Sequence, residues 1–236
     1  MTTIVFALLA IFVVWKLRSV LGQRTGAERP PQPPETMSRD AERPQPGVAR
    51  PTEPANEDRV IRMSDARERA RFDDPDRWKP FAVVGGPVAD GLDAIARRDP
   101  SFDARAFVEG AKQAYEMIVT AFAKGDRRTL QPLLAREVYD SFAAAITERE
   151  KRGEKAETTF VAIPDVKIER AAVNGSAADL TLRIHAQFIS AVRDSAGAVV
   201  DGSPDTVADV SDLWTFSRDV TSRDPNWKLV STQTGA

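Results

Sequence analysis

Apolar residues recur every three or four positions between residues 103 and 124, which predicts one long helix with a single buried stripe. Asp103 can accept hydrogen bonds at the N-cap, and Gly125 supplies a C-terminal glycine directly after Lys124. We therefore expect a helix over residues 103–124 that packs its stripe against a second layer. The stripe consists of Phe107, Ala111, Ala114, Ile118, Ala121 and Phe122.

Three shorter helical patterns flank this segment, each with one apolar side. Pro87 starts the first, and Asp126 can cap the second. The third begins near Arg136 and stops at Gly153. Their inward-facing residues are Val88, Leu92 and Ile95 in the first, Leu130, Leu133 and Leu134 in the second, and Tyr139, Phe142, Ala145 and Ile146 in the third.

Beyond Gly153 the hydrophobic period changes from helical to alternating, which is typical of strands. Apolar and polar residues alternate over 179–192, and Asn174-Gly175 just before this run favours a hairpin with residues 158–172. Pro164 inside the earlier strand implies an edge position or a bulge, because proline cannot donate to the ladder.

Two further strands complete the pattern. Residues 194–197 and 201–204 are rich in turn formers and are expected to bracket a flexible connection. A third strand follows over 207–220, with Val210, Trp214 and Phe216 on one face, and a last strand covers 227–231. Helices followed by an antiparallel meander predict an α+β fold with a sheet of about four strands.

The N-terminus carries an unbroken apolar run that predicts a membrane anchor over residues 1–22. Residues 4–15 would form a helix of about 18 Å, whereas 2–21 reach the roughly 30 Å of a bilayer core. A cleaved secretory signal is the alternative, but the cations follow the run and residues 19–22 make a poor cleavage site. The predicted anchor residues are Ile4, Val5, Phe6, Leu8, Leu9, Ile11, Phe12, Val13, Val14, Trp15, Lys16 and Arg18. By the positive-inside rule, the cations after the span place the C-terminal part in the cytoplasm.

Proline is concentrated between the anchor and residue 80, with few large apolar residues beside it. Such a segment buries too little surface to offset its ordering entropy, so residues 23–80 are expected to form a disordered tether. Trp78 lies in this segment, where we interpret it either as a docking residue or as an incidental linker residue. The folded domain is then expected over 81–236.

The amino-acid composition argues against several kinds of binding site. A formal net charge of -2 gives no basic footprint for nucleic acid. The chain has no cysteine and one histidine, His185, so neither a thiolate metal site nor a histidine cluster is expected. Alternation along its strand should point His185 away from the apolar face. An enzyme hypothesis would instead pair it with a cavity carboxylate, Asp212 or Asp179, for proton transfer.

The aromatic residues of the domain are predicted mainly to form its core. Some of them could instead line a cavity or groove that receives an apolar peptide or lipid tail, since such sites are mostly apolar. The candidates for this cavity or partner-binding role are Tyr115, Phe122, Phe142, Phe188, Trp214 and Trp227.

Several local patterns together resemble one known family. They are Leu92-Asp93-Ala94-Ile95, Asp99-Pro100-Ser101-Phe102, Phe107 to Ile118 with Tyr115-Glu116, Gly125-Asp126, Leu133-Leu134, Val138-Tyr139-Asp140-Ser141-Phe142 and Trp227-Lys228-Leu229. The chain from about Pro87 to Ser231 resembles the C-terminal domain of the mitochondrial matrix-side import tether, Tim forty-four, and the anchor and tether are similar to those of its bacterial relatives. The resemblance implies a cone-shaped domain of the nuclear-transport-factor type, with helices closing a curved sheet.

The resemblance also implies a function without catalysis or a cofactor, in which protein partners are held near a membrane and anionic lipid is touched. No transit peptide or chaperone-binding region is visible, so channel and chaperone binding are not carried over. The leading hypothesis is a single-pass scaffold of the bacterial inner membrane that recruits protein partners in protein translocation or membrane-protein assembly. No small-molecule substrate is expected, and lipid contact is expected through the N-terminal helix. The alternatives are the His185 enzyme and a periplasmic secretion-channel assembly factor.

Overall fold

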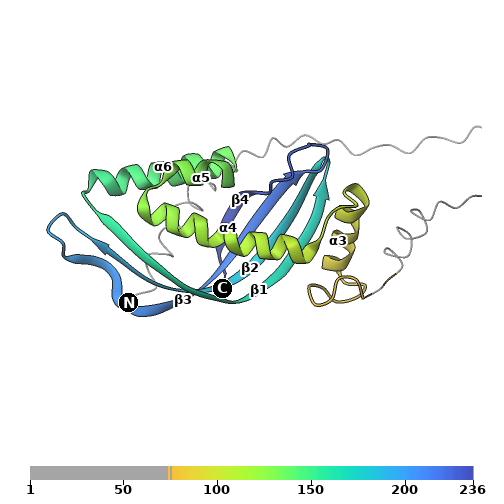
Figure 1. The fold of residues 1–236 in the computed structure, drawn as a ribbon, viewed down its shortest axis with the longest axis horizontal. Coiled ribbons are helices and arrows are strands. Elements are labelled where there is room, and N and C mark those ends of the chain that lie inside the picture. The colour runs from red at the N-terminus through yellow and green to blue at the C-terminus, as the bar shows by residue number, and fades with distance from the viewer. Residues whose placement is uncertain (1–73, 75, 236) are drawn as a thin grey trace, which may run out of the picture.

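Four helices lie over one face of a curved four-stranded antiparallel sheet in the computed structural model, which describes residues 74 and 76–235 (Figure 1). The sheet has the order β1-β2-β3-β4. The predicted α+β class and strand number are confirmed. The elements are α3 (Pro87–Arg98), α4 (Ala104–Lys124), α5 (Arg127–Leu133), α6 (Arg136–Lys151), β1 (Lys155–Asn174), β2 (Ala177–Arg193), β3 (Val199–Asp219) and β4 (Lys228–Thr234).

The predicted anchor and most of the predicted tether lie outside the described residues. None of the helices in the described part has the length and apolar composition needed to span a bilayer.

Capping side chains set the ends of the helices where the sequence predicted them. The Asp103 carboxylate accepts a hydrogen bond from the backbone N–H of Ala106 at 2.8 Å, and Gly125 ends α4 in the left-handed region with φ of 71°. Asp126 then caps α5 through the N–H groups of Arg128 and Thr129. The long helix and its short successor are therefore confirmed to within about one residue.

The β1–β2 hairpin turns at Asn174-Gly175, as predicted, and Gly175 has φ of 61°. Along β2 buried residues alternate with half-buried ones as far as Phe188, which confirms a strand with one covered face. Pro164 satisfies both conditions predicted for it, because β1 is an edge strand and its register shifts between Ala162 and Asp165. The buried β2 residues are Ala178, Leu180, Leu182, Ile184, Ala186, Phe188 and Ala191.

The predicted flexible connection over 194–204 is only partly correct. Residues 194–198 form a turn in which the Asp194 carboxylate accepts hydrogen bonds from the N–H groups of Ala196 and Ala198, both at 2.9 Å. Residues 201–204 are instead part of β3, where Gly202 pairs with Ala191. A Cβ on Gly202 would lie 2.2 Å from the carbonyl oxygen of Ser190. The glycine therefore marks a close approach of two strands rather than a loop.

The structure also corrects the interpretation of Trp78, which the sequence placed in the tether. The indole N–H of Trp78 donates to the Asp93 carboxylate of α3 at 2.5 Å, and its ring packs 6.1 Å from that of Phe102. Arg77 lies 4.3 Å above the same ring and pairs with Asp93 at 2.6 Å. Trp78 is thus packed against the helical layer, because its ring and N–H both find partners there.

Candidate functional site

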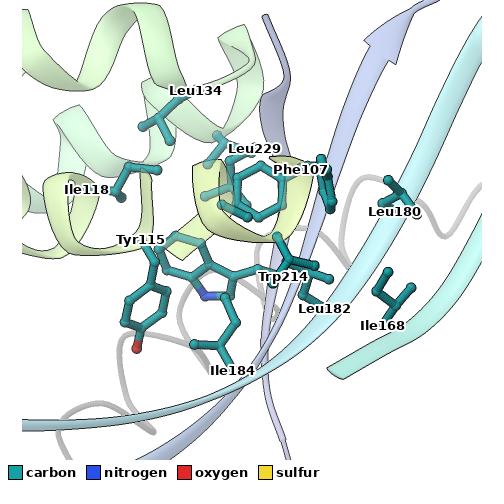
Figure 2. Packing of buried hydrophobic residues seen from close by; sticks show 14 of the residues in the cluster. Phe107, Tyr115, Ile118, Leu134, Ile168, Leu180, Leu182, Ile184, Trp214 and Leu229 are labelled. Atoms are coloured by element: carbon teal, nitrogen blue, oxygen red, sulfur yellow. The ribbon is translucent and has the colours of Figure 1, made fainter. Parts of the chain in front are cut away.

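A continuous row of aromatic side chains lies between α4 and the sheet. Phe107 of α4 contacts Trp227 with ring centroids 4.7 Å apart and Phe216 at 6.0 Å. Phe216 is followed by Trp214 at 6.3 Å, and Trp214 by Tyr115 at 4.5 Å. Figure 2 shows Tyr115 and Trp214 close together beneath the helix, with Ile184 near them. We call this set (Phe107, Tyr115, Trp214, Phe216 and Trp227) the aromatic row.

At one end of the aromatic row is a buried polar pair. Tyr115 is fully buried, and its hydroxyl donates to the Asp212 carboxylate of β3 at 2.7 Å. Asp212 lies opposite Ile184 of β2 and therefore shares the covered face of the sheet. Burial raises the pKa of Asp212 above its usual value. Burial, and then the neighbouring carboxylate, raise the pKa of Tyr115, so the phenol stays protonated and acts as a donor.

His185 lies on the opposite face of the sheet from this pair. It pairs in register with Asp165 of β1 and Ser211 of β3, whereas Asp212 is opposite Ile184. Successive side chains of a strand point to opposite faces, so the predicted outward direction of His185 is confirmed and Asp212 is out of its reach. Asp179 shares the outer face but lies six residues along the strand, about 20 Å away, and accepts a hydrogen bond from Asn174. The proton-transfer pair of the enzyme hypothesis is therefore not assembled.

Four of the six aromatic candidates from the sequence contact one another in pairs. Tyr115 meets Trp214, and Phe122 meets Phe142 at 5.1 Å. Trp227 belongs to the aromatic row, and Phe188 is buried at the centre of β2. Phe122 and Trp227 are half-buried, while the other four are buried in the common core. The structure shows that these residues pack within or against the core. Their role in binding a partner stays a prediction.

Besides the contacts of Asp93 with Arg77 and Trp78, two further polar contacts were missed from the sequence. The sequence named Asp212 only as a possible partner of His185 and missed its contact with Tyr115. Asp212 occupies an inward position between Val210 and Trp214, and a carboxylate in an apolar alternation is the signal that could have indicated a polar partner across the core. Arg218, at the end of β3, forms an ion pair with Asp99 at the C-terminus of α3, and both side chains are largely buried. Burial of Asp99 acts to raise its pKa, but hydrogen bonds from Ser101 and Arg218 outweigh burial and hold the pKa below its usual value.

Within the described residues, no group of three or more histidine, cysteine, aspartate or glutamate side chains is arranged to hold a metal ion. The arrangement offers a buried hydroxyl–carboxylate pair and an apolar aromatic core. These are features that hold helices on a sheet.

Comparisons with known proteins relate the helices and the sheet to one family. The Tim44-like domain matches residues 88–234. A mitochondrial import inner membrane translocase subunit, TIM44-1 of Arabidopsis thaliana, is 25% identical over 52% of this chain and 26% of its own length. The human subunit TIM44 is 24% identical over 61% of this chain and 32% of its own length. The matched part thus spans about a quarter to a third of these relatives.

Two other comparisons concern a bacterial protein and a solved structure. An uncharacterised protein of Rickettsia prowazekii is 24% identical over 60% of this chain and 58% of its own length. Among solved structures, the intermembrane space region of the chloroplast protein ARC6 is 15% identical over an alignment that covers 58% of this chain and 99% of its own, with a TM-score of 0.41. Because the family match covers well over half of the chain, residues 88–234 of 236, the chain belongs to the Tim44-like domain family.

Proposed function

We propose that this chain is a membrane-tethered, non-catalytic binding protein that holds protein partners at a membrane. The observation that carries the proposal is the family match, which takes in nearly every described helix and strand. The matched relatives include subunits of an inner membrane translocase. The separation of His185 from the buried Tyr115–Asp212 pair supports a binding role over proton-transfer chemistry.

The proposed organisation has three parts. An N-terminal helix over 1–22 anchors the chain in a bacterial inner membrane, a proline-rich segment up to about residue 76 tethers it, and a cone-shaped domain of the nuclear-transport-factor type follows on the cytoplasmic side. The apolar run and the cations after it support the anchor and its direction. The Rickettsia relative supports a bacterial setting.

Membrane attachment and partner recruitment can be tested together in cells that express the full chain. A Leu9→Lys/Phe12→Lys variant places two charges in the proposed anchor, and a Val83→Lys/Val84→Lys variant adds the same charges at two exposed positions of the domain. We expect the first variant to leave the membrane fraction and to lose its cross-linked partners, and the second to keep both.

A reporter fused after Ala236 tests the proposed direction of the chain. We expect a reporter that functions only in the cytoplasm to be active, and a reporter that functions only outside the cytoplasm to be inactive. Activity confined to the outside of the membrane, or retention of the Leu9→Lys/Phe12→Lys variant in the membrane, would contradict the proposal.

A further inference from the structure

Strand β3 is paired on both sides over only part of its length. It spans Val199–Asp219, while its outer neighbour β4 pairs with Asp212 to Ser217 alone. One more backbone hydrogen bond continues that ladder, from the N–H of Gly235 to the carbonyl oxygen of Ser211 at 2.7 Å. Beyond it, no strand in the described part of the chain lies against this side of β3 (Figure 1). The Ser211 carbonyl is thus already paired. In an antiparallel ladder only alternate residues of a strand direct their backbone groups to a given neighbour, so the N–H and C=O of Asp209 are the first free groups of an open sheet edge in line with β4.

Residues 204–207 limit how far this open edge can pair. Phe188 pairs with Ala208 and Ser190 pairs with Ser203, so four β3 residues lie opposite Ile189 alone and form a bulge. Proline in this bulge cannot donate to a ladder, which blunts the edge at that point. Between this bulge and Ser211, residues 208–210 form a short unpaired stretch of the edge, flanked by the apolar residue Val207, which is 45% exposed.

The charged side chains of β3 near the open edge are all negative. Between residues 194 and 217 the chain carries five aspartates and no lysine or arginine. Asp212 turns inward to Tyr115, but Asp205 and Asp209 are exposed beside the open edge, and Gln187 holds Asp209 in place through a hydrogen bond of 2.7 Å. Natural open edges are commonly protected by lysine, whereas this one carries only the opposite charge.

We propose that an extended segment of a partner protein, bearing lysine or arginine, adds as a strand to β3 at residues 208–210. The backbone of this segment continues the hydrogen-bond ladder where the pairing with β4 ends at Ser211. Its cations lie against Asp205 and Asp209, and an apolar side chain of the segment contacts Val207. A second copy of this edge is disfavoured because aspartates would then face aspartates across the new pairing. The proposal rests on the proposed partner-binding function and names the chemistry of the partner.

A set of synthetic peptides tests the proposal on the full chain in nanodiscs of uncharged lipid. The probe is a fluorescent peptide of alternating lysine and valine. A second peptide carries N-methyl groups on alternate backbone nitrogens, which removes ladder hydrogen bonds and keeps the charge, and a third replaces lysine with glutamate. We expect saturable binding of the first peptide and at least about tenfold weaker binding of the other two.

Matched variants locate the binding edge. Asp205→Asn/Asp209→Asn should weaken binding of the lysine peptide roughly three- to tenfold, because two surface charge contacts are lost. Glu157→Gln/Glu169→Gln removes the same number of charges from β1 at the other edge of the sheet and should change binding less than about twofold. Amide hydrogen exchange should slow on binding at residues 207–211.

Three outcomes would overturn the proposal: equal binding of the N-methylated peptide, equal weakening by the β1 variant, or no saturable binding. A dimer of the chain that the lysine peptide does not compete with would also overturn it, since the edge would then be occupied by a second copy. If partners are still cross-linked at the membrane while the peptide does not bind, strand addition fails and the proposed function stands. If the peptide binds and no partner is recovered, the proposed function fails.

Discussion

Tyr115 and Asp212 show how a polar pair is accommodated at the border of an apolar core. The hydroxyl and the carboxylate are linked at 2.7 Å; Tyr115 is fully buried, Asp212 is half-buried, and the fully buried residues of the described core are all hydrophobic. A buried polar atom that loses its partner keeps its desolvation cost without compensation. The pair therefore ties α4 to one register of β3 more specifically than apolar contacts alone would.

Replacing Tyr115 with phenylalanine tests this dependence. Tyr115→Phe leaves the ring in place and removes the donor to Asp212, so we expect the free energy of unfolding to fall by about 1–3 kcal/mol. Urea denaturation followed by circular dichroism measures the change. Tyr139→Phe at the other tyrosine of the chain, half-buried on α6, is the matched control and should cost less than about 0.5 kcal/mol. Equal losses in the two variants would contradict a special role for the buried pair.

The same carboxylate predicts a pH dependence of stability. Burial raises the pKa of Asp212 in the folded state, so the folded protein binds this proton more tightly than the unfolded chain. The stability that this group contributes is present below the unfolded pKa of 3.8 and is lost as pH rises through the higher folded pKa. The stability of the native chain relative to Asp212→Asn should therefore increase as pH falls from about 7 towards 4, as measured by urea midpoints. A difference that is constant or shrinks on acidification would contradict the shift.

At the scale of elements, Gly91 fixes how closely α3 approaches β1. A Cβ added to Gly91 would lie 2.0 Å from the carbonyl oxygen of Ala171, so the helix and strand could not keep their present separation. We expect Gly91→Ala to reduce the free energy of unfolding by about 1–3 kcal/mol, the usual cost of overpacking a closely packed site.

A second glycine in a helix supplies the control for this experiment. Gly110 lies in α4, and a Cβ there would meet no atom within 4 Å. Gly110→Ala should leave stability unchanged or raise it by up to about 1 kcal/mol, because alanine is the better helix former. Loss of stability in both variants would show that α3 is not held by its contact with Ala171.

The elements that the sequence predicted well are those whose local signals agree with one another. The stripe of α4, its N-cap at Asp103 and its terminal Gly125 all indicate the same helix, and the alternation of β2 indicates one covered face. Residues 201–204 misled because glycine and proline usually mark loops, while here they lie at a close strand contact and a bulge. The contact between Asp212 and Tyr115 depends on how α4 packs across β3. No local sequence pattern contains that information.

At the scale of the whole molecule, the packed unit reaches further towards the N-terminus than composition indicates. Proline and charge dominate the chain up to residue 80, so the sequence favours a folded domain that begins at 81. The structure instead packs Trp78 on Phe102 and links it to Asp93, beside the Arg77–Asp93 ion pair. These contacts hold the last residues of the predicted tether against α3 and fix the point at which the preceding chain leaves the domain.

Two fragments of the chain distinguish these boundaries. A fragment of residues 74–236 keeps Arg77 and Trp78, and a fragment of residues 81–236 lacks both. Because a half-buried tryptophan removes on the order of 100 Å² of apolar surface from water, we expect the longer fragment to be more stable by about 2 kcal/mol in urea denaturation. A Trp78→Ala variant of the longer fragment should fall close to the shorter one, while Lys79→Ala, which changes an exposed residue of the same turn, should not. Equal stability of the two fragments would instead support a folded domain that begins at residue 81.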